Sequence, residues 1–425
     1  MSAALQAQAL VVGAGPAGIA AVQRLIAAGR RTIWIDNQAR PGGQIWRGGP
    51  ERKASAQAQA WAASAARWQD SPLLTRLHSH AVLAAESPTA LLLEDMRSGQ
   101  PCRVAGEQLL LACGARERLL PFPGWTLPGV TGAGGLQALV KGGWPVAGRR
   151  VVLAGSGPLL LASADTLRAA GAEVVLIAEQ ANKSSLARFA TALPAGKLAQ
   201  AASLRWRLRQ SRYQAGLWPV RALGEQRLEA VVLSDGHSES TITCDALGVG
   251  FGLLPNTELA ELLGCRIEAG AIAVDAQQRT SLPGVFAAGE CCGIGGVDKA
   301  LLEGELAARA MLGQPLDDLR AQQRRQQRFA RALAQHFALR PELLKLAEAK
   351  TLVCRCEDVS LGELKAWPDW REAKLQTRCG MGACQGRICG PITEQLLVWP
   401  SRGLREPLQP APLRCLLGST EQGSA

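Results

Sequence analysis

The chain has 425 residues, which is too long for one hydrophobic core and predicts two or three domains. Hydrophobic residues make up 47% and charged residues 20%, a balance that excludes a disordered chain and is typical of soluble globular proteins. The formal net charge is +11, but Lys and Arg are spread along the sequence without a basic motif interleaved with aromatic residues, so nucleic acid is not an expected partner.

We expect no targeting signal at the beginning of the chain. Met1 to Ala9 lacks a basic region, and the apolar run that follows ends at Gly13. We expect no transmembrane segment, because every apolar stretch of about 18 residues is interrupted by Gly, Pro or charge. The sequence predicts a cytoplasmic protein and leaves peripheral association with a membrane open. In a reducing cytosol, clustered cysteines favour a metal or redox role over structural disulfides.

The first strongly patterned stretch, ALVVGAGPAGIAAVQRLIAAGRRTIWID, ends at Asp36. It predicts a buried strand, a Gly-x-Gly-x-x-Gly turn, an amphipathic helix and a second strand. Gly13 permits the tight turn, Gly15 lets the backbone approach a pyrophosphate, and Gly18 lets helix and strand pack closely. The helix N-terminus attracts phosphates, and an acid at the end of the second strand suits a ribose hydroxyl. We therefore predict a dinucleotide site formed by Gly13, Gly15, Pro16, Ala17, Gly18, Asp36 and Asn37.

Three later stretches resemble segments of flavoproteins that bind two dinucleotides. RPGGQIWRGG (residues 40–49) is similar to the segment that lines the flavin, and LLLACGARERLLPFPG (109–124) to the strand where the chain crosses between domains. TSLPGVFAAGECCGIGGVDKALLEG (280–304) resembles the second FAD motif, whose acidic residue binds the ribityl chain; here Glu290 replaces the usual Asp. The glycines after Glu290 are expected to open a helix that faces the flavin. The resemblance implies FAD and adds these expected contacts: Arg40, Gly43, Gln44, Arg47, Ala112, Gly114, Gly289, Glu290, Gly295 and Gly296.

RRVVLAGSGPLLLASADTLRAAGAEVVLIAE (residues 149–179) repeats the first pattern. This duplication is the layout of glutathione-reductase-like flavoproteins, in which the second unit binds NAD(P). Gly155 and Gly157 are kept, but Leu160 takes the third position, where it is expected to crowd the helix against the strand. Glu179 suits a ribose hydroxyl, and no Arg follows to favour a 2′-phosphate. Two alternatives remain: a working NAD site, or a degenerate site that is empty or holds another adenine nucleotide.

The usual groups for substrate chemistry are missing from the sequence. Neither glycine-rich unit carries the redox cysteine pair of disulfide reductases, and none of the four His lies in an acid–base signature. We therefore expect no catalytic side chain, with redox chemistry left to cofactors. Cys291 and Cys292 are adjacent and are expected to serve packing.

A group of cysteines follows a polar helical segment at residues 316–350. Cys354 and Cys356 form a C-x-C pair, and after 22 residues Cys379 and Cys384 form a C-x₄-C pair. Zinc is one alternative, but zinc sites usually space their ligands as C-x₂-C. The interleaved glycines and the C-x₄-C spacing are closer to ferredoxin loops and favour a [2Fe–2S] cluster. A fifth thiol, Cys389, is expected to serve packing, with an alternative role as a ligand.

Together these motifs resemble those of the FAD and iron–sulfur subunit of bacterial amine-dehydrogenase complexes. The family includes the large subunit of hydrogen cyanide synthase, the corresponding subunit of opine oxidase, and the α subunits of D-hydroxyproline dehydrogenase and proline dehydrogenase. The resemblance covers about residues 8 to 415, and TRCGMGACQGRICGP after a C-x-C pair is its most specific element. The cysteine-rich segment is similar to bacterioferritin-associated ferredoxin.

The resemblance implies an electron-transfer subunit with no substrate site of its own. A partner flavoprotein of the D-amino-acid or glycine oxidase type would oxidise a secondary amine or amino acid, and a small ferredoxin-like third subunit accompanies some members. Two other hypotheses remain: a self-sufficient NAD(P)H reductase, and a non-catalytic scaffold with a structural zinc.

The expected fold is α/β: a glutathione-reductase-like flavoprotein with two dinucleotide-binding domains and a small C-terminal [2Fe–2S] domain. The expected parts are an FAD-binding domain (1–124 and 245–315), a second Rossmann-like domain (125–244), a helical linker (316–350), the cluster domain (351–400) and a docking tail (401–425).

Overall fold

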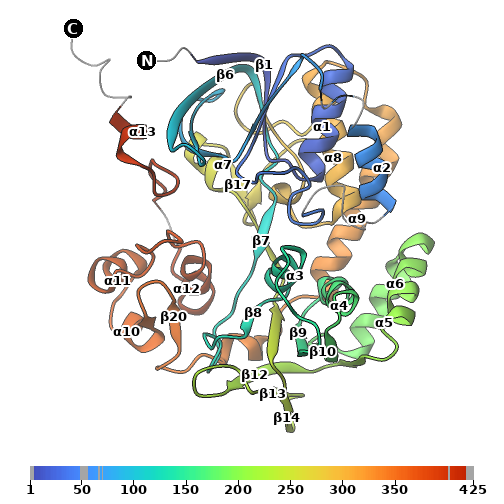
Figure 1. Cartoon of the computed structure of the whole chain (residues 1–425), viewed down its shortest axis with the longest axis vertical. Coiled ribbons are helices and arrows are strands. Elements are labelled where there is room, and N and C mark those ends of the chain that lie inside the picture. The colour runs from blue at the N-terminus through green and yellow to red at the C-terminus, as the bar shows by residue number, and fades with distance from the viewer. Residues whose placement is uncertain (1–3, 48–55, 66–67, 69, 401–402, 418–425) are drawn as a thin grey trace. The chain divides into compact units, whose positions relative to one another are not determined.

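The computed structural model of the chain describes residues 4–47, 56–65, 68, 70–400 and 403–417 (Figure 1). The chain divides into two compact units, each of which gathers segments that are far apart in the sequence. The first unit contains residues 1–116, 254–330 and 404–425, and the second contains residues 117–253 and 331–403.

The first unit is built on a seven-stranded sheet in the order β3-β2-β1-β6-β5-β4, with β19 beside β6. Parallel ladders join β1 (Leu5–Val12), β2 (Thr32–Asp36), β3 (Leu74–His78), β6 (Gln100–Leu111) and β19 (Val285–Ala287). An antiparallel edge is formed by β4 (His80–Ser87) and β5 (Ala90–Asp95). The two strands expected around the first glycine turn are confirmed as β1 and β2. Their apolar runs are buried on both faces, as parallel strands require.

Two helices of the first unit, α1 (Pro16–Ala27) and α8 (Val297–Met311), pack directly on each other (Figure 1). A Cβ atom on Gly304 would lie 2.1 Å from the carbonyl oxygen of Ala17, so only glycine permits this approach. The helix expected after Gly296 is confirmed, because α8 begins at Val297. The smaller elements of this unit are α2 (Ala56–Ala65), α7 (Glu258–Leu263), β17 (Ile267–Glu268), β18 (Ala271–Ile272), η1 (Glu290–Cys292) and η2 (Asp317–Leu319).

The second unit contains a five-stranded sheet in the order β11-β10-β9-β15-β8. Its parallel strands are β8 (Val130–Gly132), β9 (Arg150–Gly155), β10 (Glu173–Glu179), β11 (Arg212–Ala215) and β15 (Ala246–Gly250). The helices are α3 (Ala133–Lys141), α4 (Leu159–Ala169), α5 (Lys183–Ala192) and α6 (Ala195–Arg207). An antiparallel sheet is formed by β12 (Trp218–Leu223), β13 (Ala230–Ser234) and β14 (Glu239–Thr243). The repeated βαβ unit is confirmed as β9, α4 and β10.

Four connections carry the chain from one unit to the other. The first two lie at β7 (Ala115–Glu117) and β16 (Leu253–Pro255), which pair as a two-stranded ladder. The third lies within α9 (Arg320–His336), the helix expected in the polar segment before the cysteines. The fourth lies between Gly403 and Leu404.

The cysteine-rich part belongs to the second unit and shares its core. Its elements are η3 (Pro341–Lys345), β20 (Leu352–Cys354), β21 (Val359–Ser360), α10 (Leu361–Lys365), α11 (Trp370–Thr377) and α12 (Cys389–Leu397). Ser360 and Glu363 form a capping box at the start of α10, and Asp369 caps α11, so sequence-local signals fix two of the helices. The indole Nε1 of Trp125 donates to the carbonyl of Leu352 at 2.7 Å, and one apolar cluster extends from the second sheet to Cys354 and α12.

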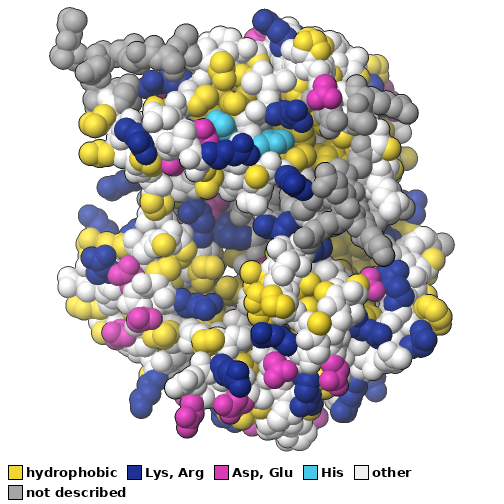
Figure 2. Space-filling view, viewed as in Figure 1, with side chains coloured by type: hydrophobic (Ala, Val, Ile, Leu, Met, Phe, Trp, Pro, Cys, Tyr) yellow, Lys and Arg dark blue, Asp and Glu magenta, His cyan; other side chains and the backbone are white. Residues whose placement is uncertain are grey.

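The last described segment, residues 403–417, contains α13 (Leu413–Leu417) and packs on β4 of the first unit. The amide of Leu408 donates to the carbonyl of Leu83 at 2.8 Å, and the carboxylate of Glu406 accepts from the amide of Ala85 at 2.9 Å. The rest of the expected docking tail lies outside the described residues. Figure 2 shows Lys and Arg side chains distributed over the visible face without one dominant patch. Among the described residues, no helix is both long and apolar enough to span a bilayer.

Candidate functional site

The first glycine turn has the geometry that its sequence predicts. Gly13 has a φ of +113°, and a Cβ atom there would lie 2.2 Å from the carbonyl oxygen of Ala112. A Cβ atom on Gly18 would lie 1.9 Å from the carbonyl oxygen of Gly13, so the third glycine brings helix and turn together. Gly15 precedes α1, and neither it nor Pro16 is fully buried. The turn therefore presents accessible backbone at a helix N-terminus, as a phosphate-binding site requires.

The segment that starts at Arg40 closes on this turn. The amide of Gly42 donates to the carbonyl of Ala14 at 2.8 Å, and a Cβ atom on Gly43 would lie 2.8 Å from the Cα of Gly15. Such backbone-to-backbone contact brings the segment to the same place as the phosphate turn. Beyond it, the guanidinium of Arg47 donates to Gln44 Oε1 at 2.6 Å. The last two residues of the motif, at 48 and 49, lie outside the described residues.

Asp36 lies at the end of β2 with partial exposure, and Asn37 beside it is exposed. The carboxylate of Asp36 accepts from the amide of Gln38 at 2.6 Å and also from the amide of Ala14. Burial raises the pKa of this carboxyl, against the lowering effect of these hydrogen bonds. Each carboxylate oxygen has a second lone pair, so the group retains acceptor capacity for a ribose hydroxyl. These residues fit the adenosine part of FAD.

The motif around Glu290 reaches the same turn from the other side. A Cβ atom on Gly289 would lie 2.9 Å from the Cβ of Ala17, at the start of α1. Glu290 Oε1 accepts from the amides of Gly295 and Gly296 at 3.0 and 2.7 Å. The longer side chain of Glu290 thus folds onto the start of α8, a contact that the comparison with the usual Asp did not anticipate.

A buried ion pair on α8 is hydrogen-bonded to the backbone of this motif. No sequence pattern indicates this pair. Lys299 and Glu303 are 5% and 6% exposed, and their charged atoms lie 2.8 Å apart. Lys299 Nζ also donates to the carbonyls of Gly289 and Gly293 at 3.2 and 2.9 Å, and Glu303 accepts from the amide of Gly289. The pair therefore holds the Gly289–Gly293 loop on α8. A Lys and Glu four residues apart on a helix usually indicate only an exposed pair.

Two other expected contact residues lie where the chain leaves β6. The amide of Ala112 donates to the carbonyl of Val12 at 2.8 Å, and the carbonyl of Gly114 accepts from the amide of Asn256 at 3.0 Å. The nearby Cys291 thiol is fully buried and donates to the carbonyls of Leu111 and Ala288 at 3.5 and 3.3 Å. These contacts agree with the packing role expected of Cys291.

The second glycine turn accommodates Leu160 without a third glycine. Leu160 is 1% exposed, and one of its methyl groups would lie 3.1 Å from a Cβ atom on Gly250. A glycine on β15 therefore provides the space that the motif lacks, so helix and strand are not forced apart. Glu179 accepts from the amides of Gly157 and Ala181 at 2.7 and 2.9 Å. Burial raises the pKa of Glu179 to about 7.

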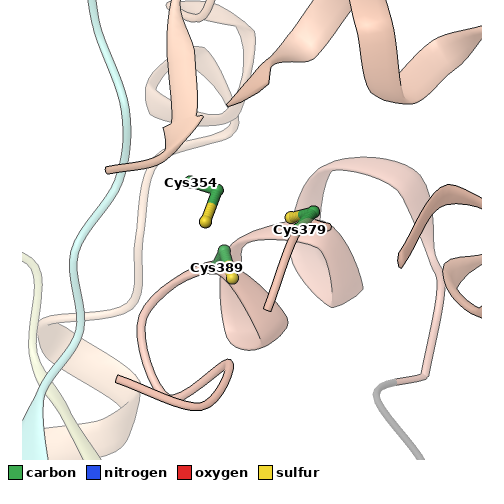
Figure 3. Close-up of side chains that lie close together, drawn as sticks. All are labelled: Cys354, Cys379 and Cys389. Atoms are coloured by element: carbon green, nitrogen blue, oxygen red, sulfur yellow. The ribbon is translucent and has the colours of Figure 1, made fainter. Parts of the chain in front are cut away.

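Three cysteines of the C-terminal part lie close together (Figure 3). The sulfur atoms of Cys354, Cys379 and Cys389 lie within 4.8 Å of one another, and all three residues are buried. The Cys384 thiol is hydrogen-bonded to Cys389 and Cys356, so all five thiols form one connected group. The sequence predicts a packing role for Cys389, but its sulfur lies inside the group. The sequence signal that could have found it is its own C-x₄-C spacing from Cys384.

The ionisation of these thiols is coupled through their contacts. Hydrogen bonding from Cys389 lowers the pKa of Cys384 to about 5 and also lowers the pKa of Cys379, whereas the same contacts strongly raise the pKa of Cys389. Thiolates are the form that binds iron or zinc. The donor set therefore fits a cluster or a metal ion held by sulfur alone.

Glycines and an ion pair hold the two cysteine segments against each other. A Cβ atom on Gly382 would lie 2.3 Å from the Cβ of Cys356, so the loop approaches the C-x-C turn as closely as backbone permits. Glu357 accepts from the guanidinium of Arg378 at 2.8 Å across the same gap. Gly380 and Gly386 have φ values of +81° and +80°. Backbone in this conformation can direct N–H groups toward bound sulfur.

Comparison with known proteins identifies the family of the chain. Residues 7–304 match the pyridine nucleotide-disulphide oxidoreductase family. The chain is 36% identical to an opine oxidase subunit of Rhizobium meliloti (strain 1021) over 423 residues, which covers 90% of each chain. It is 33% identical to hydrogen cyanide synthase subunit HcnB of Pseudomonas protegens over 429 residues, which covers 89% of each.

A solved structure shows the same fold at low sequence identity. The L-proline dehydrogenase from P. horikoshii superposes with a TM-score of 0.67 at 19% identity, covering 98% of this chain and 81% of that one. The glutathione-reductase-like fold expected from the duplicated βαβ units is therefore confirmed, and the family implies FAD. The chain is a flavoprotein oxidoreductase that belongs to the pyridine nucleotide-disulphide oxidoreductase family, within the group that includes this opine oxidase subunit and hydrogen cyanide synthase subunit HcnB.

Proposed function

We propose that the chain is the FAD- and [2Fe–2S]-containing electron-transfer subunit of a multi-subunit dehydrogenase. The observation that carries this proposal is the connected group of five thiols in a chain whose first unit is a flavoprotein domain. Its relatives are named as subunits, one of opine oxidase and one of hydrogen cyanide synthase, and the chain covers about nine-tenths of each. Similarity to them supports a role in a complex.

The substrate class that we propose is a secondary amine or amino acid of the opine, D-hydroxyproline, proline or glycine type. Oxidation of such a C–N bond to an imine releases two electrons and two protons. A partner flavoprotein subunit, of the D-amino-acid or glycine oxidase type, would perform this oxidation, and a respiratory acceptor would receive the electrons. A small ferredoxin-like subunit would be the third component of the complex.

The residues of this chain would position the two groups and exclude water. When bound, FAD supplies two-electron and a [2Fe–2S] cluster one-electron exchange. Gly13, Gly15 and Gly43 would admit the phosphates to the backbone, and Asp36 would orient a ribose. At the other site, Cys354, Cys379 and Cys389 are buried, Cys384 is half-buried and Cys356 is exposed, so one side of the group is shielded from solvent. Low solvent exposure and N–H groups directed at sulfur are the means by which a protein sets a cluster potential.

The proposal is tested by purifying the chain alone and together with a partner flavoprotein of the D-amino-acid or glycine oxidase type from the same organism. The isolated chain should contain FAD together with equal amounts of iron and sulfide, and it should barely turn over amines with an artificial acceptor. Addition of the partner should restore turnover. Robust amine oxidation by the isolated chain would contradict the proposal, and zinc in place of iron would favour a structural metal site.

A further inference from the structure

The duplicated βαβ unit provides an internal comparison between two nucleotide sites. In the first unit, Gly15 and Asp36 are partly exposed and Asn37 is exposed. Their counterparts in the second unit are Gly157, Glu179 and Gln180, and all three are buried. Glu179 is 2% and Gln180 0% exposed, so the edge of the sheet that would receive a dinucleotide is covered.

The cover is a short segment of the same unit, Phe337–Arg340, which follows α9. Ser156, between the two glycines of the turn, donates its hydroxyl to the carbonyl of Phe337 at 3.0 Å. Gln180 Nε2 donates to the carbonyl of Ala338 at 2.8 Å, and Gln180 Oε1 accepts from the amide of Arg340 at 2.9 Å. The ring of Phe337 would lie 3.8 Å from a Cβ atom on Gly157, directly beside the turn.

Aromatic contacts hold the segment at both ends. The ring of Phe337 packs edge-on against Phe189 of α5, with centroids 4.9 Å apart and an interplanar angle of 78°. The guanidinium of Arg340 lies over the ring of Trp218, 4.3 Å from its centroid. Contacts of this kind are individually modest, so several of them together fix the segment in place.

The chemistry of the cover matches that of the ligand it displaces. In a nucleotide complex of this fold, the glycine turn faces the pyrophosphate, and the residues at the end of the second strand face the adenosine ribose. Here, the carbonyl oxygens of Phe337 and Ala338 accept the hydrogen bonds that Ser156 and Gln180 would otherwise donate to oxygens of the ligand. We propose that Phe337–Arg340 is an internal occupant of the second nucleotide site, and that an adenine nucleotide binds there only when this segment is released.

Release of this segment would also affect the cysteine-rich part. Arg340 leads directly into η3, where Leu343 is 1% exposed and belongs to the same apolar cluster as Cys354. A nucleotide in the second site would therefore compete with the docking of the polypeptide that precedes the thiols. The second nucleotide site would therefore regulate the cysteine-rich part, and it would not be the place where electrons enter from NADH.

The experiment compares the wild-type chain with Phe337→Ala, which removes the ring contact with Phe189 and leaves Gln180 in place. Gln210→Ala is the control, because Gln210 is an exposed glutamine of the same unit that pairs with Arg168. Binding of NADH, NADPH and ATP is measured by calorimetry, and release of the segment by hydrogen exchange at the Arg340 amide, whose acceptor Gln180 is present in every variant. We expect this amide to exchange about fivefold faster in Phe337→Ala, the effect of losing one aromatic contact.

Nucleotide affinity should rise with this exchange rate in Phe337→Ala and stay at the wild-type level in Gln210→Ala. If a nucleotide binds the wild-type chain, the Arg340 amide should become less protected as it binds. Binding that leaves this amide protected would overturn the proposal. So would a Phe337→Ala chain whose segment opens without any gain in affinity. If Phe337→Ala leaves the segment closed, Arg340→Ala in the same background removes the contact with the Trp218 ring, and the same two criteria apply to the amide of residue 340.

Discussion

Gly382 and Cys356 lie closer together than any residue with a side chain at position 382 would allow. A Cβ atom on Gly382 would be 2.3 Å from the Cβ of Cys356, which is fixed to the backbone and cannot rotate away. The loop with three cysteines and the C-x-C turn therefore meet at a glycine.

Substitution of this glycine should damage the thiol group selectively. For Gly382→Ala we expect a loss of about 1–3 kcal/mol in unfolding free energy, because the loop must shift to relieve the overlap. Iron and sulfide content should fall, while FAD content remains that of the wild type. Gly196→Ala is the control, since a Cβ atom there meets nothing within 4 Å. Unchanged iron content in Gly382→Ala would show that the close contact is not needed for the site.

Cys389 is the thiol whose role the structure changes most. Its sulfur lies within 4.8 Å of those of Cys354 and Cys379, so we expect both Cys389→Ser and Cys354→Ser to lose iron and sulfide. Cys415→Ser is the control, because Cys415 is buried in the other unit and bonded to Gly99. The measurement is iron and sulfide per chain with the visible absorption spectrum. Full iron content in Cys389→Ser would return this residue to a packing role.

Motifs that act through the backbone could be read from the sequence, whereas contacts between distant side chains could not. Gly13 and Gly18 predict their turn because no other residue fits its φ value or its contact distances. Ser156 meets Phe337, 181 positions later, through a hydroxyl and a carbonyl. Every sequence carries such groups, so no pattern distinguishes this pair.

For the cysteines, too, the sequence predicts one part of the site and only the fold shows the rest. Their spacing predicted a common sulfur site, because thiols so clustered have few other uses in a reducing compartment. Which thiols lie in its centre depends on where α12 begins and how it packs on β20. Cys389 is the first residue of α12, and that packing brings it next to Cys354.

Removal of only one partner of the Lys299–Glu303 pair should strongly destabilise the fold. Lys299→Met leaves a carboxylate 6% exposed without its cation, and we expect a loss of about 3–5 kcal/mol in unfolding free energy. Lys299→Met/Glu303→Gln should recover part of this loss, because the amide can still accept from Gly289 without a buried charge. Denaturant unfolding measures both. The exposed pair Arg266–Glu268 is the control: Arg266→Ala should cost about 1 kcal/mol or less. Equal losses of unfolding free energy in the single and double variants would show that the unpaired buried charge does not cause the destabilisation.

Glu179 should make the stability of the second unit depend on pH. Its folded-state pKa is raised from 4.5 to about 7 by burial, so folding favours the protonated carboxyl. This contribution is complete below about pH 4.5 and is lost as the pH rises through 7, with a total of about 3 kcal/mol. The neighbouring Tyr213 stays protonated throughout this range, because burial raises its pKa also.

The pH effect is isolated by comparing melting temperatures at pH 5 and pH 8 in three chains. The wild type should lose more stability over this interval than Glu179→Gln, whose side chain does not ionise. Glu173→Gln, at the exposed start of the same strand, should show the same pH dependence as the wild type. Glu179→Gln is expected to be less stable at both pH values, because an amide accepts from only one of the two amides of Gly157 and Ala181. The decisive quantity is therefore the difference between the two pH values. If this difference is the same in Glu179→Gln and the wild type, the carboxyl ionises in the folded chain as readily as in the unfolded one, and burial does not control its pKa.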